Sequence, residues 1–192
     1  MDPKLLLLAF SVLMLLPFFW FMSMGRRTFR VPDGLTAAMK LGPLALLSGV
    51  LLGMWNGVKG TFDPAHWGAG AVIALASVVL YESARRVITG RGLSVALSGV
   101  VPPSVCVEGP YRLVRHPVYS SYLLAFLGML VAFPNAASAT LFVINFVFFI
   151  YAATSEERVL ASSPLATAYS DYKNSAGMFL PRLRRSRRAP SS

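Results

Sequence analysis

Two groups of polar residues stand out in a chain that is otherwise apolar. The first is residues 115–119 (RHPVY), and the second is the pair Glu156 and Glu157. The two glutamates come at the carboxyl end of an apolar stretch, where the dipole of a helix disfavours negative charge. They therefore need cations close by. The arginine and histidine of the first group can supply part of this charge, and a bound cationic ligand could supply more.

A third group contains Tyr169 and Tyr172. Residues 157–172 have apolar side chains at roughly helical spacing, interrupted by Pro164, which predicts an amphipathic segment lying at a membrane interface. Either tyrosine alone is equally typical of the aromatic belt of a membrane protein. The two tyrosines become informative together with the Arg-His group and the paired glutamates, because all three groups are expected on the same side of the membrane.

The rest of the chain has the composition of a membrane protein. It is 55% hydrophobic and only 14% charged, whereas soluble domains average about 25% charged residues. A spanning helix needs about 20 mostly apolar residues. We predict an all-α fold with five transmembrane helices and a C-terminal interfacial amphipathic helix. The five spans are expected near residues 5–24, 37–58, 66–81, 118–133 and 138–154.

The chain is expected to divide into an N-terminal three-span region (1–86), a C-terminal region carrying the polar groups (87–183) and a basic tail (184–192). Pro134 and Asn135 form a tight turn between the last two spans. These spans then make a hairpin, so the start of one and the end of the other meet. We therefore expect the histidine and the glutamates to converge at one membrane depth.

Positive charge predicts the orientation. Of the 18 Lys and Arg residues, all but Lys4 and Lys59 fall on one side of the predicted spans. Basic loops stay in the cytoplasm, so the N-terminus is expected outside and the C-terminus inside, with all three polar groups on the cytoplasmic side. The net charge of +10 is accounted for in this way, and no base-stacking motif favours nucleic-acid binding.

Three glycines, Gly49, Gly53 and Gly57, lie on one face of the second predicted span. Such spacing permits close helix contact, either within the chain or in a homodimer. The single cysteine, Cys106, excludes an intramolecular disulfide. The only histidines, His66 and His116, lie near opposite membrane faces, and no metal site is expected.

Taken in order, the motifs resemble those of the isoprenylcysteine carboxyl methyltransferase family, whose wider group includes phospholipid methyltransferases and bacterial relatives. The motifs that carry the resemblance are Gly109-Pro110-Tyr111, Arg115-His116-Pro117, Tyr119, Glu156-Glu157, Tyr169, Tyr172 and Pro181. The resemblance covers roughly residues 105–183. It implies a membrane enzyme, with a bacterial inner membrane as the expected location, that uses S-adenosylmethionine.

By that resemblance six residues would bind the cofactor: Tyr111, His116, Tyr119, Glu157, Tyr169 and Tyr172. Arg115 and Glu156 would have catalytic roles beside them. These residue types suit such a cofactor, because aromatic faces attract its sulfonium, carboxylates bind its amino or ribose groups, and arginine pairs with its carboxylate. The acceptor would be a small or lipid-like molecule that reaches the site from the bilayer.

Two alternatives stay open. Sterol and steroid reductases have a similar Arg-His-Pro-x-Tyr element and use NADPH. A non-catalytic scaffold or transporter subunit is the other alternative. A transporter would be expected to carry ionisable residues inside its spans, and the centres of four predicted spans have none.

Overall fold

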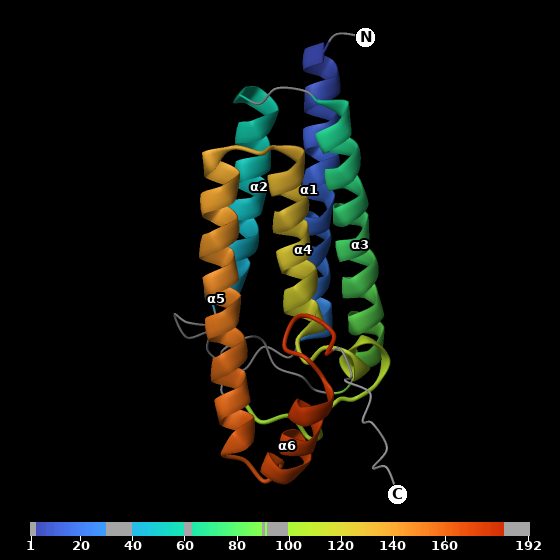
Figure 1. Ribbon diagram of the computed structural model, residues 1–192, viewed down its shortest axis with the longest axis vertical. Helices are drawn as coiled ribbons and strands as arrows, with labels where there is room; N and C mark the ends of the chain where they lie inside the picture. Colours follow the sequence, from blue (N-terminus) through green and yellow to red (C-terminus); the bar gives the residue numbers. More distant parts are fainter. Residues whose placement is uncertain (1–2, 30–39, 60–62, 90, 92–99, 183–192) are drawn as a thin grey trace, which may run out of the picture.

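The computed structural model describes residues 3–29, 40–59, 63–89, 91 and 100–182. Figure 1 shows long helices running side by side, with a short helix, α6, at one end of the bundle. The helices are α1 (Pro3–Thr28), α2 (Leu41–Lys59), α3 (Pro64–Ile88), the 3-10 turn η2 (Gly109–Arg112), α4 (Pro117–Ala132), α5 (Ala136–Ala161) and α6 (Ala166–Ser175). The described part of the chain contains no β-strand, which confirms the all-α prediction; the tail 184–192 lies outside it.

Three helices are long and apolar enough to cross a membrane, namely Lys4–Gly25, Pro64–Ile88 and Ala136–Ala161. The apolar stretches of α2 and α4 are shorter, Leu41–Asn56 and Pro117–Ala132. At 1.5 Å per residue a 16-residue helix covers about 24 Å, less than the roughly 30 Å of a hydrocarbon core. The membrane character is therefore supported, and the five-helix bundle contains three clear candidate spans.

The fifth helix is longer than the predicted span. It begins at Ala136, where the Asn135 side chain accepts a hydrogen bond from the Ser138 backbone at 2.9 Å, and it continues to Ala161. The paired glutamates thus lie one turn inside the helix instead of at its end. The expected amphipathic segment 157–172 is divided between the last turn of α5 and α6, with Pro164 in the connection.

Glycines allow a close contact between the backbones of α3 and α4. A Cβ atom on Gly70 would lie 2.7 Å from the backbone oxygen of Gly128, and a Cβ on Gly128 would lie 3.0 Å from the oxygen of Gly70. Either residue with a side chain would force the two backbones apart. Helix α3 is thereby held against the last turn of α4, at the end of this helix opposite to the polar groups.

The glycines of α2 pack inside the chain. A Cβ on Gly49 would lie 2.3 Å from the Phe18 ring of α1, and a Cβ on Gly53 would lie 2.4 Å from the Leu15 side chain. Of the two roles considered for this face, these two glycines take the intramolecular one. The surroundings of Gly57 are outside the description, and a homodimer remains an untested prediction.

The main core joins the two predicted regions of the chain, and a smaller cluster of Tyr169, Tyr172 and Ala176 lies beside it. Its largest fully buried side chains include Phe18 and Phe21 of α1, Trp67 and Tyr81 of α3, and Phe126 of α4. Because these side chains come from both sides of position 86, the N-terminal helices and the motif-bearing helices pack as one bundle.

Candidate active site

The start of α4 and the end of α5 meet as the hairpin requires. The Nε2 atom of His116 lies 3.3 Å from the Oε1 atom of Glu157, and its Nδ1 atom lies 3.7 Å from the Oε2 atom of Glu156. Each ring nitrogen therefore faces a carboxylate. The predicted convergence of the histidine and the two glutamates is confirmed.

Glu157 is the centre of the cluster. Its side chain is only 6% exposed and its Oε1 atom also accepts a hydrogen bond from the Arg115 Nε at 2.8 Å. The second oxygen, Oε2, lies 3.1 Å from the Nζ atom of Lys173 in α6. Three basic side chains thus surround one buried carboxylate, which gives this carboxylate the compensation that its burial requires.

Arg115 is fixed by the backbone as well as by Glu157. Its Nη1 atom donates to the carbonyl oxygen of Ala176 at 2.5 Å. Beside it, the Arg115 backbone N–H donates to the oxygen of Gly177 at 2.7 Å, and that of His116 donates to Met178 at 3.1 Å. The chain after α6 therefore runs along the residues that lead into α4 and holds them in place.

Glu156 has a more open position. Its side chain is 35% exposed and accepts a hydrogen bond from the hydroxyl of Tyr119. The Tyr119 ring is stacked on the His116 ring, with centroids 5.5 Å apart and planes 5° apart. On the other side it stacks on Phe149, with centroids 5.3 Å apart. Aromatic faces and carboxylates are thereby adjacent, as the predicted chemistry requires.

The other three predicted tyrosines come from η2 and α6. The Tyr172 hydroxyl donates to the carbonyl oxygen of Tyr111 at 2.7 Å, so it fastens α6 to the turn before α4. Burial raises the pKa of Tyr111 and of Tyr172, and both phenols stay neutral. Burial, with the nearby charge of Glu157, also raises the pKa of Tyr169.

Tyr169 differs from the other two in its hydroxyl group. The residue is 4% exposed. Its oxygen has no well-formed hydrogen bond to another described residue, although Glu157 and Arg115 lie close enough to shift its pKa through side-chain hydrogen bonds. A buried hydroxyl without a partner is uncommon, because it loses its hydrogen bonds to water without replacement. The hydroxyl therefore lies beside Glu157 and Arg115 and can turn from them to a ligand.

A comparison with protein families gives the cluster a context. The model of the phospholipid methyltransferase family matches residues 65–163, more than half of the chain. The chain belongs to this family. No curated protein and no solved structure matches it.

The match extends from α3 to the connection after α5, so it includes Tyr111, residues 115–119 and both glutamates. The family is one of membrane methyltransferases, which agrees with the apolar helices. Tyr169 and Tyr172 lie beyond the matched range, and their link to the site comes from the contacts of α6.

Sequence reasoning missed Lys173. It lies beside Tyr172, and in the sequence it counted only as one of the basic residues that predict the orientation. A helical reading of 166–175 places Lys173 one turn after Tyr169, on the same face. That periodicity is the signal that could have found it.

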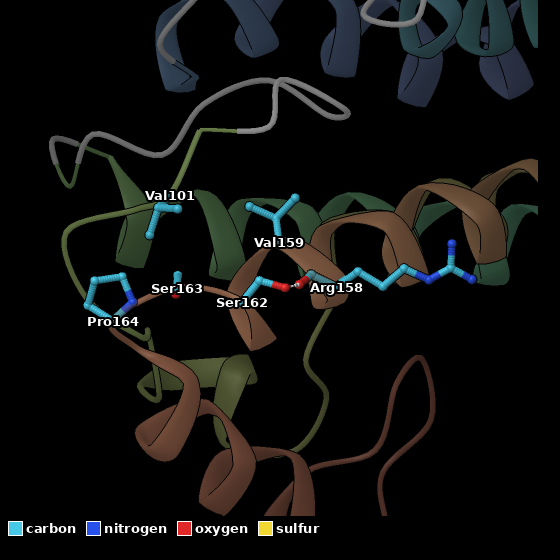
Figure 2. Close-up of a pocket in the computed structure, with 6 residues that line it drawn as sticks. All are labelled: Val101, Arg158, Val159, Ser162, Ser163 and Pro164. Carbon is cyan, nitrogen blue, oxygen red and sulfur yellow. Dashed lines mark hydrogen bonds between the residues drawn. The ribbon is translucent and has the colours of Figure 1, made fainter.

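A hollow of about 470 Å³ lies on a different face of α5. Figure 2 shows its lining, with Val101 facing Val159, Ser162, Ser163 and Pro164 near the end of α5, and with the Arg158 side chain directed away along the helix. None of the eight predicted site residues lines it. Around Glu157, the nearest nitrogen atoms of Arg115, His116 and Lys173 lie 2.8, 3.3 and 3.1 Å from its oxygens.

Proposed function

We propose that this chain is an S-adenosylmethionine-dependent methyltransferase that acts on a small or lipid-like acceptor at the cytoplasmic face of a membrane. One observation supports this proposal above the others. In a chain of a methyltransferase family, the buried carboxylate of Glu157 lies within hydrogen-bonding distance of the His116 imidazole, and the ring of Tyr119 is stacked on this imidazole.

The residues present suit the cofactor. When bound, S-adenosylmethionine supplies a methyl group on a positively charged sulfur. Glu157 would bind the ammonium of its amino-acid part, and the stacked faces of His116 and Tyr119 would lie near the sulfonium. The hydroxyl of Tyr169, which lies beside Glu157 and Arg115, would donate to a polar group of the cofactor. Tyr111 and Tyr172 would shape the site by fixing the turn before α4 to α6.

The two residues with predicted catalytic roles receive different tasks in this proposal. Arg115 is 8% exposed and bonded to Glu157 and to the backbone, so it positions the carboxylate and does not contact the reacting atoms. Glu156 is more exposed and shares Tyr119 and His116. It would accept a hydrogen bond or a proton from the acceptor as the acceptor is methylated.

Positive charge favours the cytoplasm as the compartment of the site. Arg85 and Arg86 end α3 on the same side of the bundle as the cluster, and basic residues are retained on the cytoplasmic side. The N-terminus would then lie outside. Exposed apolar side chains along α5, including Val143, Ile144 and Val147, would face lipid, from which an acceptor can approach.

The test is ligand binding by the full chain in detergent. Calorimetry should show binding of S-adenosylmethionine and of S-adenosylhomocysteine, and Glu157→Gln should weaken both at least tenfold. Glu82→Gln is the matched control, because Glu82 pairs only with the nearby Arg85 of α3 among the described residues. Binding of NADPH in place of both nucleosides would refute the proposal and support a reductase.

A further inference from the structure

Lys173 differs from the other two basic residues that contact Glu157. Arg115 and His116 are 8% and 9% exposed, whereas the Lys173 side chain is 54% exposed. Lys173 is also the only one of the three that contacts the Oε2 atom. One oxygen of the carboxylate is therefore held from inside the protein and the other from the solvent side.

The three contacts also differ in how easily they can be broken. Arg115 is bonded to the Ala176 carbonyl, and the His116 ring is stacked on Tyr119, so neither can leave without moving backbone or core. Lys173 has a flexible four-carbon side chain that ends in a compact ammonium. Rotation of this chain alone would carry the ammonium into water, and an ion pair with one exposed partner is weak.

We propose that the Lys173 ammonium lies in the position that the ammonium of the cofactor's amino-acid part would take, so that the two compete for the Oε2 atom of Glu157. This inference rests on the proposed function. Both groups are primary ammonium ions with the same donors and charge, so only one of them can occupy this position, and two of them side by side would repel each other. Lys173 therefore lowers cofactor affinity and must turn outward for the cofactor to bind.

The opposite role for the same residue is a contact with the carboxylate of the cofactor. The two roles predict opposite effects of Lys173→Met, which removes the charge and keeps an apolar stem. Under competition, affinity for S-adenosylhomocysteine rises about two- to fivefold, as expected for loss of a half-exposed ion pair. Under carboxylate binding, affinity falls.

A control variant and a control ligand separate competition from a general effect of charge. Arg158→Met removes the same charge from an exposed residue next to Glu157, and Arg158 makes no ion pair within the described residues. The ligand 5′-methylthioadenosine has no amino-acid part and so no ammonium. Its affinity should be the same in Lys173→Met as in the unaltered chain.

Competition is supported if Lys173→Met, and not Arg158→Met, increases affinity for S-adenosylhomocysteine and leaves that for 5′-methylthioadenosine unchanged. It is overturned if Lys173→Met weakens the binding of S-adenosylhomocysteine, leaves it unchanged, or changes it no more than Arg158→Met does. In those cases the proposed function stands, because the unaltered chain still binds the nucleoside. If the unaltered chain binds neither ligand, the proposed function fails and the competition fails with it.

Discussion

Replacing Glu157 by glutamine should destabilise the protein far more than the same change at Glu156. Glutamine keeps the size of the side chain and one acceptor oxygen but removes the negative charge. At position 157 the change leaves Arg115, at 8% exposure, without its counter-ion. At position 156 the side chain is 35% exposed, and the Tyr119 hydroxyl can donate to an amide oxygen as well.

The size of the difference follows from burial. A hydrogen bond to a charged group contributes about 1.5–3 kcal/mol and a neutral one about 0.5–1.5 kcal/mol. Glu157 has two such partners in the interior, Arg115 and His116. Loss of charge assistance in both should cost about 2–3 kcal/mol, below the roughly 3–5 kcal/mol for removing one partner of a buried pair. Lys173 adds little, because it is half exposed. For Glu156→Gln we expect under about 1 kcal/mol.

The measurement is unfolding of the full chain in mixed micelles, followed by tryptophan fluorescence. Arg115→Met combined with Glu157→Gln completes a double-mutant cycle. The double variant should be more stable than the sum of the two single effects predicts, because neither charge then remains alone. Equal destabilisation by Glu157→Gln and Glu156→Gln, or additive effects in the cycle, would refute the assignment of Glu157 as the centre of a buried ionic cluster.

Two further predictions use matched pairs of variants. Tyr172→Phe should lower the free energy of unfolding by about 1–2 kcal/mol, because it removes the donor to the Tyr111 carbonyl. Tyr169→Phe should change the free energy of unfolding by less than about 0.5 kcal/mol and weaken S-adenosylhomocysteine binding. Denaturant titration measures the first effect and calorimetry the second, and a destabilising Tyr169→Phe would contradict the prediction. Gly70→Ala should lower the free energy of unfolding by about 1–3 kcal/mol, because the new Cβ forces α3 away from α4. Gly68→Ala should leave it almost unchanged, because nothing lies within 4 Å of the new Cβ. Equal melting temperatures of these two variants would contradict the close contact.

The sequence predicted the helices well, because each depends on a local property. Runs of apolar residues between polar loops gave the positions of α1 to α5, and the Pro134-Asn135 turn gave the hairpin of α4 and α5. The ends of helices were less accurate. The prediction ended the fifth span at Thr154, but α5 continues to Ala161, because partners from other segments compensate its buried carboxylate.

The contacts of the candidate site also differ in how far the sequence predicts them. The pairing of His116 with the glutamates was predictable, since a tight turn between two spans of similar length leaves their far ends no other place. Lys173 was not, because its contact depends on how α6 folds back beneath the hairpin. The sequence also left open whether the α2 glycines pack within the chain or in a homodimer. In the structure, Gly49 and Gly53 pack against α1.

By itself, then, the sequence determined that the chain is helical and apolar, that its charge is concentrated at one end of the helices, and that His116 and the glutamates share a membrane depth. Only the tertiary structure decided which glutamate is buried and which basic side chains surround it. Depth follows from the length of a helix, a property of consecutive residues. Which side chains touch one another depends on how each helix is rotated about its own axis and on where segments distant in sequence lie. Side-chain packing in the tertiary structure determines the rotation and these positions.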